Sequence, residues 1–279
     1  MKKIILILSI IILMSSILYF QNNSIVITRH KIKSSKIPKE FNNIKLLHLS
    51  DLHSKVFGKN NKQIINKINK EQPDIIVITG DLIDRRSYNE EKAMSLIHGI
   101  KDIAPIYYVT GNHEGWSNKF SFLEVKLKEK GVIVLRNESI SIRKSEQEIF
   151  ILGIDDPSFN TIGYREKYKD YDIAKEEIEK IKRENAFNIL LCHRPELFDL
   201  YVEKDMDLVF TGHAHGGQIN IPFLGGIIAP NQGFFPKYHK GVYNEKNTNM
   251  VVNRGLGNSL FPQRLFNRPE IVCVELVKK

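Results

Sequence analysis

The segment Asp74-Ile75-Ile76-Val77-Ile78-Thr79-Gly80-Asp81-Leu82-Ile83-Asp84 decides the fold class. Its first half is a short apolar run rich in β-branched residues, which predicts a buried β-strand. The strand ends directly in a glycine followed by two carboxylates, Asp81 and Asp84. We therefore expect a strand that delivers acidic side chains to its carboxyl end.

The same arrangement, a short apolar strand that ends in a small polar cluster, recurs along the chain. The pairs of strand and cluster are Ile44–Ser50 with Asp51-Leu52-His53, Ile106–Thr110 with Gly111-Asn112-His113-Glu114, Asn188–Cys192 with His193, and Leu208–Thr211 with Gly212-His213-Ala214-His215. In α/β folds, ligands bind just beyond the carboxyl ends of the strands. We therefore expect all these clusters to converge on one site.

Helix-length amphipathic stretches alternate with these strands. They are Asn61–Glu71, Glu90–Ile100, Phe120–Lys130 and Ile173–Glu184, and further strands are expected at Ile149–Ile154, Val251–Asn253 and Ile271–Leu276. This alternation predicts a layered α/β domain, which we place at residues 40–279.

The residue types in the clusters favour a metal site. The chain has nine histidines, five of them in the clusters, together with aspartates and one asparagine. Neutral imidazole and carboxylate ligands suit divalent ions such as Mn, Fe or Zn. Cys192 and Cys273 are far apart and form no CxxC pair, so a structural zinc knuckle is excluded. Seven or eight donors exceed the needs of one ion and fit two ions that share a carboxylate.

Glycine placement supports the same interpretation. Gly80, Gly111 and Gly212 each precede a candidate ligand by one residue. Glycine permits sharp turns and close approach of the backbone. Ordinary loop glycines would be unremarkable one at a time, but three in the same register favour a shared role.

The ordered set D-x-H, G-D-x-x-D, G-N-H-E, a lone His and G-H-x-H, from Asp51 to His215, resembles the calcineurin-like metallophosphoesterase superfamily. The surroundings of the first and last motifs are similar to one membrane-associated bacterial branch, which includes the UDP-2,3-diacylglucosamine pyrophosphatases. The resemblance implies a four-layer α-β-β-α sandwich. It also implies a hydrolase of phosphodiester or pyrophosphate bonds that uses two divalent metal ions.

The resemblance assigns a role to each matching residue. Asp51, His53 and His215 would hold one metal, and Asn112, His193 and His213 would hold the other, with Asp81 bridging both. His113 would act as a general acid or contact the phosphate, and Asp84 would orient its imidazole.

The chemistry of the residues agrees with these roles. A carboxylate has two oxygens and offsets the charge of two cations, which suits Asp81 as a bridge. Water between two such cations becomes a hydroxide nucleophile near neutral pH, and His113 would stabilise the departing oxygen. A hydrogen bond from Asp84 would raise the pKa of His113. Asp84 could instead cap a turn, and Glu114 could simply begin the next helix.

Several other residues have weaker claims. Arg85 or Arg86, which follow the second motif, could bind a phosphate, although a solvated arginine is the simpler interpretation. Trp116 could line the pocket, but packing is favoured. The histidines outside the motifs are expected to be structural; they are His30, His48, His98 and His239.

The N-terminus predicts a membrane segment. Ile4–Phe20 carries no charge, and the bulky residues before Gln21 argue against a cleavage site, so residues 1–21 are interpreted as a retained anchor and 22–39 as a basic juxtamembrane segment. Lys2 and Lys3 favour a cytoplasmic N-terminus and an extracytoplasmic catalytic domain, whereas the basic residues after the apolar stretch favour the opposite.

The chain carries a net charge of +9, but residues 1–45 contribute +7 of it. The folded part is therefore nearly neutral, which argues against nucleic acid and favours anionic lipid headgroups as the partner of the basic segment. A soluble nucleotide phosphodiesterase and a non-catalytic metal-binding scaffold are the alternatives. The scaffold is disfavoured because every motif position is intact.

The stretch from Ile219 to Pro236 is apolar, uncharged and rich in Gly and Pro, and it begins directly after the last motif. Such a composition makes a helix improbable. It is interpreted either as a buried loop or as an apolar wall that accepts acyl chains or touches a bilayer.

Overall fold

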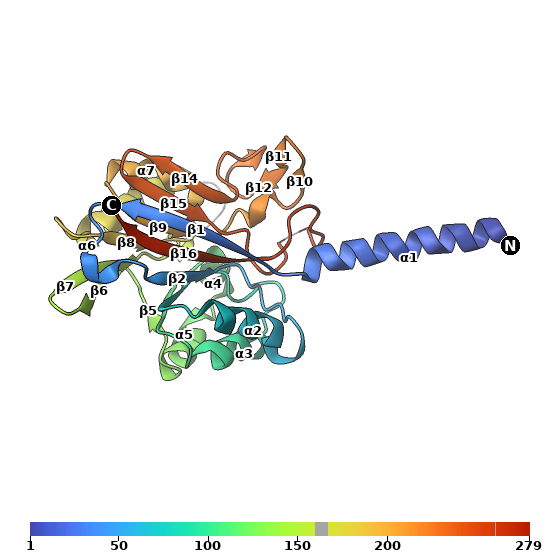
Figure 1. Ribbon diagram of the computed structural model, residues 1–279, viewed down its shortest axis with the longest axis horizontal. Helices are drawn as coiled ribbons and strands as arrows, with labels where there is room; N and C mark the ends of the chain where they lie inside the picture. Colours follow the sequence, from blue (N-terminus) through green and yellow to red (C-terminus); the bar gives the residue numbers. More distant parts are fainter. Residues whose placement is uncertain (160–166, 260) are drawn as a thin grey trace.

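The computed structural model describes residues 1–159, 167–259 and 261–279. Two six-stranded sheets form its centre (Figure 1). The first has the order β1-β16-β2-β3-β4-β5 and the second the order β14-β15-β9-β8-β7-β6.

The strands of the first sheet are β1 (Val26–Ser34), β16 (Glu270–Lys278), β2 (Lys45–Leu49), β3 (Ile75–Thr79), β4 (Ile106–Val109) and β5 (Ile133–Val134). Those of the second are β14 (Gly241–Glu245), β15 (Thr248–Val252), β9 (Leu208–Thr211), β8 (Asn188–Leu191), β7 (Gln147–Gly153) and β6 (Glu138–Lys144). In each sheet four neighbouring strands run parallel, β2 to β5 in one and β15, β9, β8 and β7 in the other. Their carboxyl ends therefore lie at a common edge.

Helices cover the outer face of each sheet. The elements are α2 (Lys62–Glu71), α3 (Glu90–Ile100), α4 (Asn112–Ser117) and α5 (Phe120–Glu129) beside the first sheet, and α6 (Lys167–Ile181) and α7 (Phe198–Glu203) beside the second. Apolar residues at helical spacing, such as Ile64 and Ile68 of α2, face the sheet and are fully buried.

Three apolar clusters hold the layers together. One joins α2, α3 and α5 to the first sheet, a second fills the space between the two sheets, and a third joins α6 and α7 to the second sheet. Alternate residues of a strand enter different clusters, as Ile76 and Val77 of β3 show. The architecture is the predicted α-β-β-α sandwich.

Every strand and helix expected from the sequence is present, with ends shifted by a few residues. The sequence did not predict β1, which lies inside the segment assigned as juxtamembrane. It pairs in parallel with β16 from Val26 to Ser34 and is a full member of the first sheet. The mixture of basic and apolar residues in this edge strand, for example Arg29 and Lys31, hid it, because its outer positions are solvated.

The N-terminal apolar segment forms one helix, α1 (Lys2–Asn23), that projects from the domain (Figure 1). None of its residues is buried. By length and composition it is able to cross a membrane, and signal sequences share these properties.

Residues 219–236 are neither a helix nor a buried loop. They form two small antiparallel hairpins, β10 (Asn220–Ile221) with β11 (Gly225–Gly226) and β12 (Ile228–Ala229) with β13 (Gly233–Phe234). These hairpins lie on the side of the domain from which α1 leaves (Figure 1). Burial of this stretch, the simpler of the two interpretations, is contradicted by large exposed side chains such as Phe223 and Phe234.

Candidate metal centre

The polar clusters at the strand ends converge as expected. The residues that follow β2, β3, β4, β8 and β9 meet at the edge where the parallel strands of both sheets end. All of the candidate ligands there are buried; they are Asp51, His53, Asp81, Asn112, His193, His213 and His215.

One group of potential ligands comprises Asp51, His53, Asp81 and His215, whose ligand atoms all lie within 4.8 Å of one another. The His215 Nε2 is 3.2 Å from Asp51 Oδ1, and the His53 Nε2 is 3.6 Å from Asp81 Oδ2. The two imidazole nitrogens are only 3.0 Å apart. Two imidazoles and two carboxylates therefore point at one volume.

A second group comprises Asp81, His193 and His213. The His193 Nε2 lies 3.3 Å from Asp81 Oδ2, while its Nδ1 is 2.6 Å from the Thr79 carbonyl oxygen. Donation from Nδ1 to that carbonyl leaves the Nε2 lone pair directed at the centre. Asp81 therefore belongs to both groups of potential ligands.

Unpartnered buried atoms show that the residues fit metal ions. Asn112 Oδ1 and His193 Nε2 are buried and have no hydrogen-bond partner among the described residues. Buried polar atoms without partners are rare in folded proteins and call for an ion or water. Together with the two groups above, they form a site suited to two divalent metal ions.

The electrostatics of the cluster point the same way. Burial holds the pKa of His53 at about 3 and those of His213 and His215 well below the usual value, so these imidazoles are neutral, as metal ligation requires. Burial raises the pKa of Asp51 to about 6. A buried pair of carboxylates is stabilised when cations offset its charge.

Asp81 and His193 behave as a coupled pair. Burial opposes both charged forms, but the imidazoles of His193 and His113 keep the pKa of Asp81 well below its usual value. Burial likewise lowers the pKa of His193, but the attraction of Asp81 outweighs it and raises that pKa to about 10.

Several candidate ligands have a strained backbone. Asp51, His53, Asp81, His213 and His215 all have positive φ angles, between 48° and 63°. Non-glycine residues adopt this region uncommonly, and such strain concentrates at functional sites. The surrounding packing therefore holds the ligands in conformations that the local sequence does not favour.

Two of the three glycines noted in the sequence make room for ligands. A Cβ atom at Gly111 would collide with Asp81 Oδ1, and one at Gly212 would collide with Asp51 Oδ2. The register of these glycines thus follows from the close approach of neighbouring strand-end loops.

Glu114 fixes the loop that carries Asp81. Its carboxylate accepts hydrogen bonds from the backbone N–H groups of Asp81 (2.7 Å), Ile83 (3.2 Å) and Gly111 (2.8 Å). The side chain is fully buried. It therefore does more than begin a helix: it ties the second and third clusters together.

His113 lies at the rim of the cluster beside Asp84. The two side chains approach to 3.5 Å between Nδ1 and Oδ1, and the Arg85 backbone nitrogen lies 3.1 Å from the same Nδ1. Burial lowers the pKa of His113, but Asp81 and Asp84 outweigh this effect and raise it. The neighbouring carboxylates therefore favour a protonated imidazole.

Asp84 also binds Arg86. Its Oδ1 accepts from the Arg86 backbone N–H at 2.8 Å, and its Oδ2 accepts from the guanidinium at 2.8 Å. Burial raises the pKa of Asp84, but hydrogen bonds from His113 and Arg86 outweigh it, so the carboxyl group stays ionised. Asp84 thus closes a turn and also contacts His113.

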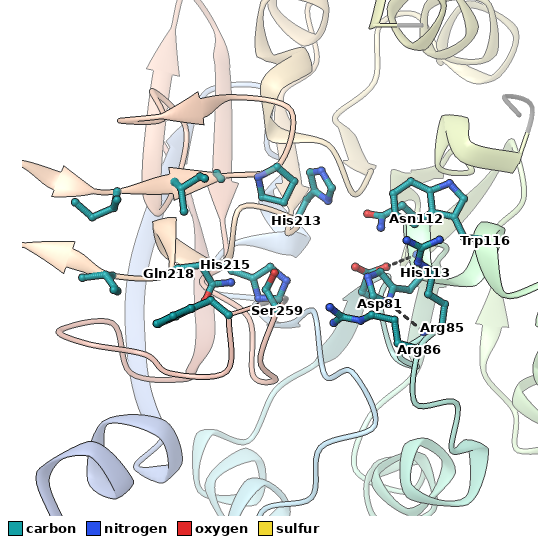
Figure 2. Close-up of a pocket in the computed structure, with 16 residues that line it drawn as sticks. Asp81, Arg85, Arg86, Asn112, His113, Trp116, His213, His215, Gln218 and Ser259 are labelled. Carbon is teal, nitrogen blue, oxygen red and sulfur yellow. Dashed lines mark hydrogen bonds between the residues drawn. The ribbon is translucent and has the colours of Figure 1, made fainter. Parts of the chain in front are cut away.

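A cavity of about 560 Å³ opens onto the cluster. Figure 2 shows Asp81, Asn112, His113, Arg85, Arg86 and Trp116 on one side, and His213, His215, Gln218 and Ser259 on the other. Ile219, Ile227, Ile228, Ala229, Pro230 and Phe261 add an apolar wall. Part of the stretch after the last motif therefore lines the cavity.

The residues with weaker claims are now placed. Both arginines line the cavity; Arg86 is paired with Asp84, and Arg85 lies 4.6 Å above the Trp116 ring. Trp116 is thus part of the wall, and not only packing. His48 is structural, since its Nε2 is 2.7 Å from the Thr79 hydroxyl, and its ring is fully buried.

Sequence reasoning missed two supporting residues near the C-terminus. Asn253 follows β15 directly and donates to the His48 carbonyl at 2.9 Å. Arg264 is fully buried, donates to the Gly257 carbonyl at 2.6 Å, and lies 3.5 Å from His215 Nδ1. Asn253 had the same signal as the other clusters, a strand ending in a polar residue, whereas Arg264 had none.

Comparison with known proteins supports the site. The family model of calcineurin-like phosphoesterases matches residues 44–217. An uncharacterized metallophosphoesterase of Bacillus subtilis, YkuE, is 32% identical over 92% of this chain and 87% of its own length. A transmembrane protein with a metallophosphoesterase domain from Bos taurus is 28% identical over 88% of this chain and 55% of its own length.

Among solved structures, a phosphopantetheinyl hydrolase from Mycobacterium tuberculosis superimposes with a TM-score of 0.49 at 13% identity, covering 77% of this chain and 91% of that one. The family match spans every motif of the metal centre from Asp51 to His215. This chain belongs to the calcineurin-like phosphoesterase family and is a metal-dependent phosphoester hydrolase.

Proposed function

We propose that the protein hydrolyses phosphodiester or pyrophosphate bonds in a lipid-linked substrate, with two divalent ions of the Mn, Fe or Zn class. The observation that carries this proposal is the position of Asp81. Its carboxylate belongs to two adjacent ligand groups and lies next to His113, at the base of a cavity with a cationic side and an apolar side.

The ligands would divide between two ions. Asp51, His53 and His215 would hold one, and His193, His213 and Asn112 would hold the other, with Asp81 contributing to both. The support is the grouping of the ligand atoms and the unpartnered Asn112 Oδ1 and His193 Nε2. Such ions lower the pKa of water that attacks phosphorus and neutralise charge on the phosphoryl oxygens.

The chain itself supplies the rest of the chemistry. His113, whose pKa is raised by the adjacent carboxylates, gives a proton to the departing oxygen. Asp84 holds the imidazole in place from the side of Nδ1. Arg85 and Arg86 line the cavity and provide positive charge for a second phosphate or other anionic substituent.

The shape of the cavity favours a phosphate with two different substituents. At about 560 Å³ it is far larger than a phosphate group. Guanidinium groups line one side, and Ile219, Ile227 and Ile228 line another. A polar headgroup on one side and an acyl-bearing group on the other would match these surfaces.

Membrane anchorage by α1 completes the proposal. The helix has 22 residues, which corresponds to about 33 Å, enough to cross a hydrocarbon core of roughly 30 Å. Lys2 and Lys3 favour a cytoplasmic N-terminus and an extracytoplasmic catalytic domain. The substrate would then be a lipid of the same membrane.

A substrate screen tests the function. The full chain, purified in detergent with Mn²⁺, is assayed on phosphomonoesters, a chromogenic phosphodiester, soluble nucleotides and nucleotide-linked lipids. We expect turnover of the diester. The kcat/KM should be highest for a lipid-linked compound and should exceed that for its deacylated analogue. Equal values for the acylated and deacylated pair would reject the lipid-linked substrate, and a preference for free nucleotides would favour the soluble nucleotide phosphodiesterase. Absence of hydrolysis of every one of these substrates by a metal-loaded sample would reject the enzymatic function.

A further inference from the structure

Large apolar side chains are exposed together on the α1 side of the domain. They belong to the two hairpins and to the loop before β16, and we call them the apolar tip: Phe223, Leu224, Phe234, Phe235, Phe261 and Phe266. Their exposed fractions range from 51% for Phe261 to 108% for Phe223. Soluble surfaces rarely gather so many aromatic side chains, and such patches mark interaction sites.

The parts of the apolar tip are joined to one another. The backbone N–H of Asn220 donates to the Leu265 carbonyl at 2.9 Å, which links the first hairpin to the loop. Ile227 lies between the hairpins: its N–H donates to the Ile219 carbonyl at 2.9 Å beside the first hairpin, and its carbonyl accepts from the Phe235 N–H at 2.8 Å beside the second. The two hairpins and the loop are therefore hydrogen-bonded to one another.

The same loop is fastened to the end of α1. Asn22 donates to the Pro262 carbonyl at 3.0 Å and accepts from the Arg264 N–H at 2.7 Å, and Gln263 donates to the Leu18 carbonyl at 3.1 Å. The guanidinium of Arg268 lies 4.7 Å from the centre of the Phe20 ring. The end of α1 thus has a fixed place beside the apolar tip, as Figure 1 shows for β10, β11 and β12.

The attachment of the loop to α1 indicates what covers the apolar tip. A helix that spans the bilayer places its last apolar residues, here Tyr19 and Phe20, at the level of the lipid headgroups, where aromatic side chains are favoured. Side chains fixed beside that end are brought to the same level. The exposed Lys237, next to the second hairpin, adds positive charge for anionic headgroups.

We propose that the apolar tip inserts into the bilayer that α1 spans, so that the cavity of the metal centre opens at the headgroup layer. Phe261 belongs both to the tip and to the cavity wall, and Ile228 of the second hairpin also lines the cavity. The apolar wall is therefore continuous with the membrane surface. The phosphate group of a lipid then reaches the metal centre while its acyl chains remain in the bilayer. This inference rests on the proposed anchorage by α1.

Fluorescence quenching tests the insertion without any assay of catalysis. The full chain is reconstituted in vesicles of phosphatidylethanolamine and phosphatidylglycerol, with an environment-sensitive fluorophore on Phe223→Cys or Phe234→Cys. The native Cys192 and Cys273 are buried, and unsubstituted protein measures any background labelling. Ser9→Cys reports on α1, and Phe122→Cys, a 68% exposed phenylalanine on α5, is the matched control.

We expect labels at 223 and 234 to shift to the blue, to be quenched by nitroxide-bearing lipids and to be shielded from aqueous iodide, with the reverse at 122. Iodide quenching at 223 and 234 equal to that at 122, with Ser9→Cys quenched by lipid, would overturn the insertion and leave the anchor intact. Iodide access at position 9 would overturn the anchorage and the insertion together. Shielding at 223 without lipid quenching, increasing with protein density, would instead assign the surface to a second copy of the chain.

A paired substitution gives a functional readout. Phe223→Ser with Leu224→Ser removes two tip residues that do not line the cavity. Hydrolysis of a bilayer-embedded phosphodiester lipid should fall several-fold, while turnover of a soluble chromogenic diester stays at the wild-type rate. Phe122→Ser with Val125→Ser is the control for added surface polarity and should change neither rate. An equal fall for both substrates in the tip variant would count against the docking role.

Discussion

The metal centre and the apolar tip are neighbouring regions that differ in the polarity and the burial of their side chains. The metal centre collects charged and polar side chains in a fully buried place, whereas the tip displays apolar side chains in water. Gln218 and Ser259 line the cavity on the same side as His215 (Figure 2), and Phe261 of the tip lines the same cavity. Both arrangements cost stability in a simple soluble domain. Each becomes favourable with a partner, metal ions for the first and lipid for the second.

The largest effect on activity is expected when the proposed bridging carboxylate, that of Asp81, is removed. Asp81→Asn takes away the charge shared by the two ligand groups, so hydrolysis of a chromogenic phosphodiester with Mn²⁺ should fall to background. Metal content, measured on the same samples by elemental analysis, should fall with it. Wild-type turnover in a metal-loaded Asp81→Asn protein would contradict the bridging role. Asp74→Asn, an exposed acid at the other end of β3, is the matched control and should be fully active.

Replacement of the proposed general acid, His113, should have a smaller effect on activity. His113→Ala leaves the proposed ligands in place but removes the proton donor, and kcat should fall by roughly 10²- to 10⁴-fold. The loss should be smaller for a substrate whose leaving group has a low pKa, because such a group departs without a proton. Equal losses for good and poor leaving groups would show that His113 acts in another way.

Replacement of Asp84, the carboxylate proposed to position His113, should have a still smaller effect on activity. Asp84→Asn keeps the turn but weakens the electrostatic support of His113, and activity should fall by about 10- to 100-fold. The alkaline limb of the pH–rate profile is the decisive readout. Loss of Asp84 lowers the pKa of His113, so the decline of activity with rising pH should move to lower pH. An unchanged profile would leave Asp84 a purely structural residue.

The smallest effect is expected for stability at the apolar tip. Phe234→Ser changes a 73% exposed side chain and should alter the free energy of unfolding in detergent by less than about 0.5 kcal/mol. Phe210→Ala, in the core between the sheets, should cost about 3–5 kcal/mol. Denaturant titration of both variants measures the difference. A large loss for Phe234→Ser would mean that the tip serves folding and not docking.

Much of the metal centre could be predicted because its information is local. Each ligand follows a strand whose apolar run is visible in the sequence, and parallel strands must end at one edge, so convergence follows from the fold class. The positive φ angles of Asp51 and His213 could not be predicted, since they are imposed by packing against distant loops. The same holds for Arg264, whose contact with His215 joins residues 49 positions apart.

The sequence by itself determined the layered α/β class, the candidate metal-binding residues and the existence of an apolar N-terminal helix. Only the tertiary structure decided that Glu114 ties two clusters together, and that residues 219–236 form exposed hairpins on the side of the domain from which α1 leaves. The physical reason is that periodicity and motif spacing report on local hydrogen bonding and burial. Whether an apolar segment faces the core or the solvent depends on the elements that pack around it, and these come from remote parts of the chain.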